Sequence, residues 1–266
     1  MAVIDSAGLL RAYDDQLRDE AETPSAITVR RMGPLRLATF RGGRGFITYR
    51  NLDEVPEGGI ADLVGRALVH YTSSPEIRRV EWKTRGHDHA PGLHEALVAG
   101  GFAPGEPESV MVGELCLLAG DVALPPGVVV RQVTDEVDVR AMCAMQDETF
   151  GESPSEEYAD AILHRLRTRD DMELWVAEAQ GQIVSAGRLE PVEGSEFAGI
   201  WGGATRPAWR GKGIYRALTA ARARSALARG KRYVHSDSTE FSRPILERSG
   251  LVRVSTTTPY EWRRGT

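Results

Sequence analysis

A short, basic, glycine-rich segment constrains this chain more than any other feature of its sequence. Residues 206–215 read Arg-Pro-Ala-Trp-Arg-Gly-Lys-Gly-Ile-Tyr and directly follow the apolar run 197–205, which is typical of a buried strand. An amphipathic helical pattern then covers 214–229. Backbone N–H groups in the first turn of a helix lack partners within the helix and bind anions such as phosphate. The order of strand, basic glycine turn and helix therefore predicts a site for a phosphate-bearing ligand.

The glycine pattern excludes two common phosphate-binding loops. A Walker A loop would need Ser or Thr after Gly211-Lys212, where this chain has Gly213, and it would need a glycine five residues before Gly211. A dinucleotide-binding fingerprint would need a third glycine where Arg216 stands. The segment must therefore serve a different class of phosphate ligand.

Composition and charge narrow the class of protein. The chain has 266 residues and a formal net charge of −5, which gives no support for a nucleic-acid or membrane partner. No apolar run reaches the roughly 18 residues of a membrane span, and the N-terminus lacks the pattern of a signal peptide. Cys116 and Cys143 lie far apart in sequence, as reduced structural thiols do. We expect a soluble cytoplasmic protein.

The pattern of elements divides the chain into two similar parts. Residues 118–126 contain two prolines and one glycine, and predict a linker between a first domain, 1–117, and a second, 127–266. In the second domain we expect strands at 128–133, 173–179, 183–192, 197–205, 232–238 and 251–258, and helices at 135–150, 155–167, 214–229 and 242–249. In the first we expect helices at 9–21, 60–71 and 93–99, and strands at 26–32, 35–41, 45–50 and 79–84. The order strand, short helix, glycine, strand recurs at 79–112 and 232–258, which indicates internal duplication.

Residues 210–215, Arg-Gly-Lys-Gly-Ile-Tyr, resemble the acetyl-CoA signature of the GNAT acyltransferase superfamily, Arg/Gln-x-x-Gly-x-Gly/Ala. The preceding Arg206-Pro207 and the downstream Gly250-Leu251 fit the same resemblance, which covers 127–266 well and 1–117 only as architecture. It implies an α/β protein of two GNAT-like domains, each a mixed, mostly antiparallel sheet flanked by helices. The first domain would be a degenerate copy without the signature.

The resemblance also implies where acetyl-CoA, the acyl donor, would bind. In that family the strand before the signature bulges away from its neighbour, and the pantetheine arm pairs with it like an extra strand. By position, this part of the strand would be residues 204–206. The diphosphate would then lie on main-chain N–H groups from Lys212 to Ala217, as the free N–H groups of a helix start allow. The expected binding residues are Ala204, Thr205, Arg206, Arg210, Gly211, Lys212, Gly213, Ile214, Tyr215, Arg216, Ala217 and Thr239. No metal is expected.

Three positions depart from the family pattern. The sixth signature residue is Tyr215 rather than Gly or Ala. The family often has a tyrosine in the short helix before Gly-Phe, which protonates the leaving thiolate, and this chain has Leu246 there. A common asparagine seven residues earlier is replaced by Thr239. Binding of CoA is therefore better supported than catalysis.

The first domain lacks the phosphate turn. Where the turn should lie, the segment 51–59 carries Asp53, Glu54 and Glu57. Carboxylates at a helix start oppose an anion. We expect that this domain does not bind CoA.

The candidates for the general base that deprotonates an amine are Asp237, Glu190 and His235. Asp237 equally fits a helix cap or a turn, Glu190 an exposed strand position and His235 a half-buried strand position. Tyr260 is a candidate substitute for the missing proton donor. The histidines of the segment 87–94 suggest either a metal site or, as we prefer, a polar surface loop.

These observations favour transfer of an acetyl or other short acyl group from CoA to a primary amine of a small molecule or peptide, by a monomer or homodimer. The main alternative is a non-catalytic acyl-CoA-binding module, which Leu246 favours. An aminoacyl transferase that uses charged tRNA is a third reading, and the acidic net charge argues against it.

Overall fold

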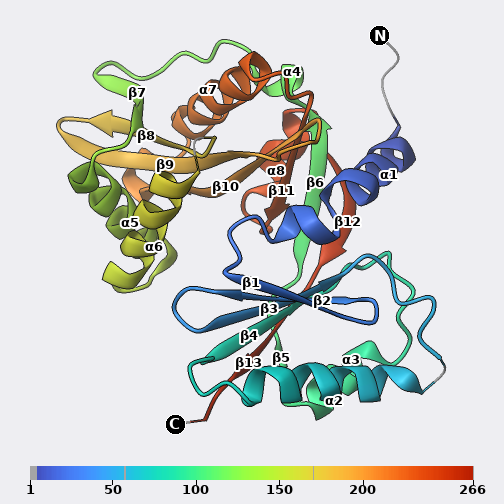
Figure 1. Cartoon of the computed structure of the whole chain (residues 1–266). Helices are drawn as coiled ribbons and strands as arrows, with labels where there is room; N and C mark the ends of the chain where they lie inside the picture. Colours follow the sequence, from blue (N-terminus) through green and yellow to red (C-terminus); the bar gives the residue numbers. More distant parts are fainter. Residues whose placement is uncertain (1–4, 57, 170, 266) are drawn as a thin grey trace. The chain divides into compact units, whose positions relative to one another are not determined.

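The computed structural model describes residues 5–56, 58–169 and 171–265 (Figure 1). The chain forms two compact units. Unit 1 comprises 1–110, 237–243 and 253–266, and unit 2 comprises 111–236 and 244–252. Glu57, one of the three carboxylates expected to oppose a phosphate, lies outside the described residues.

Unit 1 is built on a six-stranded mixed sheet. Its strands lie in the order β1 (Thr28–Met32), β2 (Leu35–Phe40), β3 (Arg44–Tyr49), β4 (Arg79–Lys83), β13 (Pro259–Arg263) and β5 (Ala103–Pro104). All neighbours are antiparallel except β3 and β4. Helices α2 (Gly59–Thr72) and α3 (Leu93–Ala99) cover one face (Figure 1). The core between helices and sheet is apolar and includes Leu37, Leu63 and Trp82.

The last strand of the chain belongs to unit 1. The sequence pattern predicts one domain over 127–266, but β13 pairs with β4, with Tyr260 opposite Trp82. Tyr260 and Trp82 are also members of the same buried apolar cluster. The packing of these aromatic side chains, which no local pattern records, explains why the C-terminal strand joins the first sheet.

Unit 2 contains most of a seven-stranded sheet. Its strands lie in the order β12 (Val252–Thr257), β6 (Glu108–Glu114), β11 (Tyr233–Ser238), β10 (Phe197–Thr205), β9 (Gln182–Pro191), β8 (Glu173–Ala179) and β7 (Val128–Val133). Residues 108–110, 237–238 and 253–257 of these strands group with unit 1. The pairing of β10 with β11 is parallel, whereas β7 to β10 are antiparallel.

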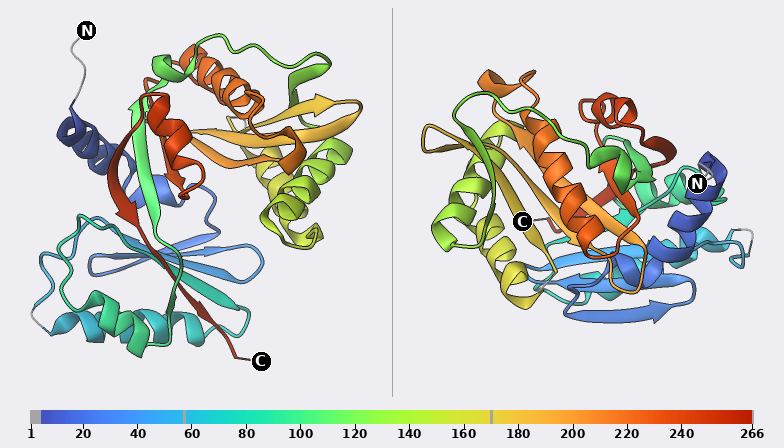
Figure 2. Two further views of the ribbon diagram at one scale, coloured as in Figure 1. Left: turned by 180° about the vertical axis from the view of Figure 1, so that it is seen from behind. Right: turned by 90° about the horizontal axis from the view of Figure 1, so that it is seen from above.

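Helices cover both faces of the sheet in unit 2. Helix α7 (Ile214–Ala228) lies on one face, while α5 (Glu136–Phe150) and α6 (Glu156–Thr168) lie on the other (Figure 2). Small residues of α7 pack against Leu189 and Ile200, whereas α5 and α6 pack against Ala186 and Ala204. The remaining elements are α1 (Ser6–Leu17), η1 (Asp19–Glu22), α4 (Leu115–Leu118), η2 (Pro207–Trp209) and α8 (Arg243–Arg248). Two mixed sheets flanked by helices confirm the expected fold class.

Two local differences from the sequence expectations have clear causes. The helix expected at 9–21 ends at Leu17, because Asp19 adopts a left-handed φ of 68°, and the short η1 follows. Leu118, the first residue of the expected linker 118–126, belongs to α4, a short helix that the sequence pattern did not predict. Residues 119–127 contain no regular helix or strand, as a segment rich in proline and glycine predicts.

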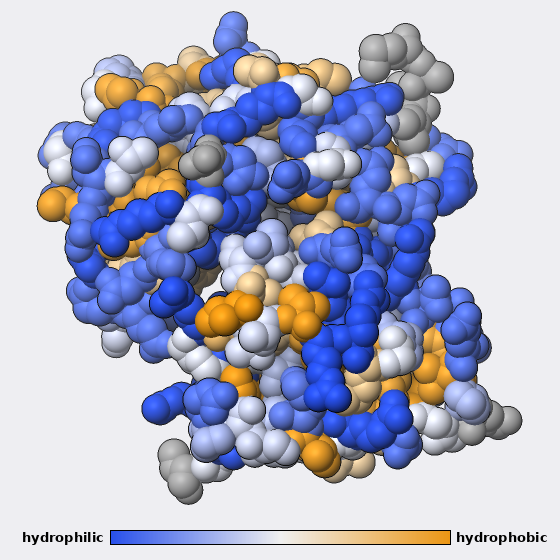
Figure 3. Space-filling view, in the orientation of Figure 1, coloured by the Kyte–Doolittle hydropathy of each residue, from blue (hydrophilic) through white to orange (hydrophobic). Residues whose placement is uncertain are grey.

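Hydrophilic side chains cover most of the face drawn in Figure 3, and hydrophobic residues appear there in small separate groups. Within the described part of the chain, no helix is long and apolar enough to cross a membrane. Large apolar side chains are instead concentrated in the clusters beneath the helices.

Candidate functional site

Strand β10 separates from its neighbour β11 partway along its length. The parallel pairing covers only Phe197 to Gly199, with Gly199 opposite His235. On its other edge β10 stays paired with β9 as far as Thr205. The β11-facing edge of β10 is therefore open from Ile200 onwards, and an exposed strand edge can pair with the amide groups of a ligand.

A bulge interrupts β10 within this open part. The register with β9 shifts between Trp201 and Ala204, and the two intervening residues are Gly202 and Gly203. Gly202 has a φ of 60°, a conformation that other residues rarely adopt. β10 thus has a bulge, as the resemblance implies, but the bulge lies at 202–203 rather than at the expected residues 204–206.

The main chain then turns into α7 with its first N–H groups free of side-chain caps. Gly211 and Gly213 have φ values of 74° and 79°, and Gly213 is the N-cap without a capping side chain. The helical hydrogen bond to the N-cap carbonyl runs from the N–H of Ala217 to Gly213. The amides at the start of α7 thus remain available for an anion, and the dipole of the 15-residue helix favours negative charge there.

The basic side chains around this turn have different surroundings. Lys212 lies over the ring of Trp209, with Nζ 4.7 Å from the ring centroid, and Arg216 is exposed at the start of α7. Arg210 donates a hydrogen bond from Nε to the carbonyl of Thr205 at 3.0 Å. Arg206 instead pairs with Glu148 at 2.9 Å and donates to the carbonyl of Ile183. The charge of Arg206, which was expected to contact pantetheine, is thus paired with a carboxylate.

The other residues expected to contact pantetheine face β9. The carbonyl of Ala204 accepts a hydrogen bond from Ser185 Oγ at 2.8 Å, and the hydroxyls of Ser185 and Thr205 lie 2.8 Å apart. The N–H of Arg206 donates to the carbonyl of Val184. A ligand along the open edge would therefore contact residues 200–203 first, and the contacts expected for 204–206 remain a prediction.

A cavity of about 460 Å³ lies beside the N-terminal turns of α7. Its walls come from α7, from α8 and from the segment 117–122, which includes the start of the linker. They comprise Leu117, Leu118, Gly120, Asp121, Val122, Tyr215, Arg216, Thr219, Ile245, Leu246, Arg248 and Ser249. Leu246, which occupies the family's tyrosine position, is 1% exposed.

The linker lies along α7 in both figures of the fold (Figures 1 and 2). Arg224 holds it there by donating to the carbonyls of Ala119 and Gly120 at 3.1 and 3.2 Å. A Cβ atom added to Gly213 would lie 3.6 Å from the carbonyl oxygen of Ala123. The linker therefore passes close to the uncapped end of the helix and bounds the site on that side.

Glu190 lies on β9 within a group of arginines rather than at an exposed position. Its carboxylate pairs with Arg165, with Arg169 at 3.0 Å and with Arg188 at 3.2 Å. Burial by itself raises the pKa of Glu190, but the three guanidinium groups outweigh burial and hold the pKa below its ordinary value of 4.5. A carboxylate of such low proton affinity is a weak general base.

His235 lies at the point where β10 and β11 separate. It is opposite Gly199, the last paired residue of β10. Its ring meets that of Trp201 edge-on, with centroids 5.1 Å apart, and that of Phe197 with centroids 6.1 Å apart. The half-buried strand position expected from the sequence is confirmed, and it is next to the open edge of β10.

Asp237 and Thr239 belong to unit 1. Asp237 forms an ion pair with Lys83, and the two side chains are 8% and 18% exposed. Burial lowers the pKa of Lys83, but the charge of Asp237 acts against it and the pKa is raised overall. Thr239 accepts backbone hydrogen bonds from Ser242 and Arg243 at the start of α8. Asp237 and Glu190 therefore lie in different units, and the roles predicted for Asp237 and Thr239 stay predictions.

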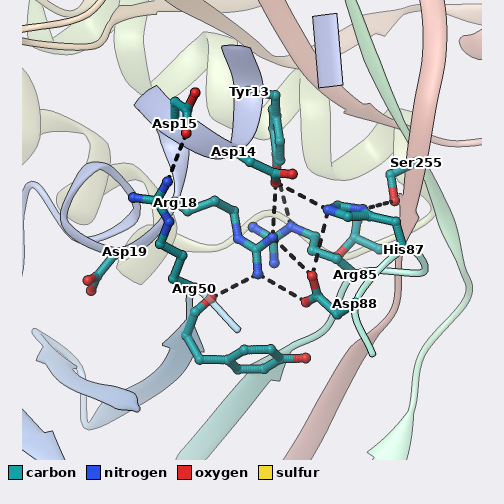
Figure 4. A network of polar contacts seen from close by, with 12 residues as sticks. Tyr13, Asp14, Asp15, Arg18, Asp19, Arg50, Arg85, His87, Asp88 and Ser255 are labelled. Carbon is teal, nitrogen blue, oxygen red and sulfur yellow. Dashed lines mark hydrogen bonds and ion pairs between the residues drawn. The ribbon is translucent and has the colours of Figure 1, made fainter. Parts of the chain in front are cut away.

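The histidines of 87–94 take part in hydrogen bonds within unit 1. Figure 4 shows His87 between Ser255 and Asp14, with Nδ1 2.6 Å from the serine hydroxyl and Nε2 3.2 Å from the carboxylate. Arg18 pairs with Asp14 and Asp88 nearby. Among the described residues, no group of three or more His, Cys, Asp or Glu side chains is arranged to hold a metal ion. These contacts are those of a structural network.

Tyr260, the candidate substitute donor, is also part of unit 1. Its hydroxyl lies 2.8 Å from Nδ1 of His94, and its ring belongs to the buried cluster under α2 and α3. The structure thus gives Tyr260 a role in the packing of the first sheet.

Comparison with known proteins agrees with this geometry. Residues 139–250 match the model of the Acetyltransferase (GNAT) family. The matched segment runs from α5 to the glycine after α8, so it contains the bulged strand, the signature turn and the walls of the cavity that come from α7 and α8. This part of the chain is therefore similar to the GNAT acetyltransferase family. No curated protein sequence matches the chain.

Solved structures of low sequence identity share the fold over both domains. A GCN5-related N-acetyltransferase from Kribbella flavida is 14% identical, with 98% of this chain and 95% of that chain covered and a TM-score of 0.66. A GCN5-related N-acetyltransferase from Sphaerobacter thermophilus is 18% identical, with coverage of 88% and 78% and a TM-score of 0.62. A tandem GNAT protein from the clavulanic acid biosynthesis pathway is 13% identical, with coverage of 100% and 98% and a TM-score of 0.61. The chain thus has the fold of a tandem GNAT protein.

Two side chains that the sequence does not predict at the site contact the bulge. Gln146 of α5 donates from Nε2 to the carbonyl of Gly202, and a Cβ on that glycine would lie 3.0 Å from Arg188. The adjacent pair Gly202-Gly203 inside a strand pattern is the signal that could have located the bulge. No local signal identifies the helix and strand residues that pack on it.

Proposed function

We propose that unit 2 is an N-acetyltransferase that moves an acetyl or other short acyl group from CoA to a primary amine of a small molecule or peptide. One observation carries the proposal: the open edge of β10 leads directly to the uncapped N-terminus of α7, beside a cavity of about 460 Å³. CoA matches this arrangement, because its extended pantetheine arm carries amides that can pair with a strand edge and its diphosphate can bind at a helix N-terminus.

Two sets of main-chain groups would hold CoA. The amides of Ile214, Tyr215 and Arg216 would bind the diphosphate, and the helix dipole adds to that attraction. Lys212 and Arg210 would add positive charge from the turn. The pantetheine arm would then follow the open edge of β10 towards the bulge at Gly203. The thioester carbonyl would thereby reach the bulge, where a backbone N–H can stabilise an oxyanion.

His235 is the best placed of the three candidate bases. It lies where β10 and β11 separate, and its ring contacts Trp201, the residue before the bulge. Glu190 is neutralised by three arginines, which reduces its proton affinity. We therefore propose that His235 removes the proton of the amine. The negative charge of Glu190 would instead stabilise the positively charged arginines beside the bulge.

A non-catalytic acyl-CoA-binding module remains the second candidate. The buried Leu246 in the cavity wall favours it, because an alkyl side chain cannot protonate a thiolate. Release of free thiol from acetyl-CoA in the presence of a panel of primary amines separates the two functions. Amine-dependent thiol release supports the acetyltransferase, whereas CoA binding without turnover for any amine supports the binding module.

A further inference from the structure

The cavity beside α7 contains a phenol that the family pattern does not expect. Among the described residues that line it, Tyr215 is the only tyrosine. Leu246 lies in the wall of the same cavity. Leu246, at the position of the expected proton donor, and Tyr215, whose phenol has no role in the family pattern, therefore line the same cavity.

Tyr215 reaches the bulge of β10. A Cβ atom added to Gly203 would lie 2.7 Å from Cε2 of Tyr215 and 3.2 Å from its hydroxyl oxygen. Only glycine at 203 leaves room for the ring, so the phenol packs directly on the bulge backbone. This is where the proposed path of pantetheine along β10 brings the thioester.

Arg222 follows Tyr215 on α7 and lies in the interface between α7 and β9. It is 1% exposed, and Nη1 donates to the carbonyl of Arg188 at 3.1 Å while Nη2 donates to Thr219 Oγ1 at 3.1 Å. Gly187 makes room for it, since a Cβ there would lie 2.6 Å from Nη1. A guanidinium so deeply buried normally requires a compensating carboxylate.

In the part of the chain that the structure describes, the surroundings of Arg222 supply no such carboxylate. Burial lowers the pKa of Arg222, and the ionisable groups that act on it are Tyr215, which raises the pKa, and Arg188, which lowers it. No carboxylate within the described chain is among them. A buried positive charge held against a phenol is suited to stabilise negative charge that develops beside that phenol.

We propose that Tyr215 donates the proton to the leaving thiolate of CoA, in place of the tyrosine that Leu246 replaces, and that Arg222 supports it as a positioning residue. This inference rests on the proposed acetyltransferase function. The amine nitrogen forms a bond to the thioester carbon and the carbon–sulfur bond breaks, with its electron pair left on sulfur. Sulfur takes the hydroxyl proton of Tyr215 and gives free CoA. The phenolate, stabilised by Arg222, regains a proton from solvent, while the proton of the amine leaves through the base.

The proposed contact between the hydroxyl of Tyr215 and the sulfur of CoA can be tested directly by the binding of two nucleotides to the full chain. Calorimetry at alkaline pH would compare CoA with desulfo-CoA, in which hydrogen replaces the thiol, on the wild type and on Tyr215→Phe. A hydrogen bond to a charged sulfur should make CoA bind about tenfold more weakly to Tyr215→Phe. Desulfo-CoA should bind both proteins equally. Arg222→Met should lose part of the same thiol-specific affinity, which a purely structural role would not affect.

Turnover gives an independent readout. Tyr215→Phe should lower kcat for acetyl-CoA by about a hundredfold with little change in KM, as expected for loss of a general acid. Addition of Leu246→Tyr to that variant should restore much of the rate, because residue 246 lines the same cavity. Loss of rate without rescue, together with equal loss of affinity for both nucleotides, would overturn the role of Tyr215.

The outcomes separate this inference from the function on which it rests. A wild type that binds neither nucleotide would overturn the CoA-dependent function and the inference with it. A wild type that binds both, with Tyr215→Phe unchanged or equally weakened towards both, would overturn only the inference. Loss of affinity for CoA but not for desulfo-CoA in Tyr215→Phe would support both the CoA-dependent function and the role of Tyr215.

Discussion

Gln146 donates a hydrogen bond from its side-chain amide to the carbonyl oxygen of Gly202, in the bulge of β10. The bulge is thereby fixed from both faces of the sheet, because Tyr215 packs on Gly203 from the α7 side. A backbone segment that must present an N–H group to a reacting carbonyl benefits from such fixation, since misplacement by a fraction of an ångström reduces stabilisation of the transition state.

Replacement of Gln146 by Leu should loosen the bulge. The carbonyl of Gly202 would lose its partner, which costs about 1–3 kcal/mol when the group stays buried. We expect kcat/KM for the best amine of the panel to fall about tenfold or more. Gln132→Leu is the matched control, because that glutamine bonds to Glu173, away from the bulge. Steady-state kinetics that are equal for the two variants would show that Gln146 has no part in the site.

Replacement of His235 by Gln should remove the general base. The expected result is a fall in kcat of about a hundredfold with only a small change in affinity for CoA. The activity that remains should rise with pH as the free amine fraction increases. His164→Gln on α6 is the control, and its rate should equal that of the wild type. A His235→Gln enzyme with the wild-type rate and pH profile would exclude the assignment.

Replacement of Glu190 by Gln should change stability in a pH-dependent way. The folded state holds the pKa of Glu190 below 4.5, so its ion pairs stabilise the protein above about pH 4.5 and lose this effect as pH falls through the folded-state pKa. The variant leaves Arg165, Arg169 and Arg188 without their shared carboxylate, and should lose about 3 kcal/mol of unfolding free energy near neutral pH.

Urea unfolding at several pH values measures this effect. The difference between the wild type and Glu190→Gln should shrink as the pH is lowered below 4.5. Glu157→Gln, an exposed carboxylate in the first turn of α6, controls for the loss of one surface charge. A difference that is constant over the whole pH range would contradict the ion-pair explanation.

The sequence predicted the parts of the fold that depend on local patterns. Most of the longer helices and strands, the glycine turn at 211–213 and the helix that follows were recognisable, because φ requirements and apolar periodicity act over a few residues. The same holds for the strand that carries the bulge.

Long-range partners could not be predicted in this way. The pairing of β13 with β4 depends on aromatic packing between residues almost 180 positions apart. The arginines around Glu190 come from α6, from the loop after it and from β9, and Asp237 pairs with Lys83 in unit 1. No spacing rule in the sequence relates such residues, because only the folded chain brings them together.

Gly213 tests whether the start of α7 binds the diphosphate. Its φ of 79° disfavours any side chain, and a β-branched residue would also hinder approach of the ligand to the helix amides. Gly213→Val should therefore weaken CoA binding by about tenfold or more. Gly230→Val is the matched control, because Gly230 has a φ of 76° at the opposite end of the same helix. Both variants should lose similar unfolding free energy, of about 1–2 kcal/mol.

Calorimetric titration of the wild type, Gly213→Val and Gly230→Val with CoA is thus the most direct test. We predict saturable binding to the wild type and to Gly230→Val, and a selective loss of affinity in Gly213→Val. A wild type that shows no heat of binding with CoA at millimolar concentration, or a Gly213→Val variant with unchanged affinity, would contradict the assignment of the diphosphate to the amides at the start of α7.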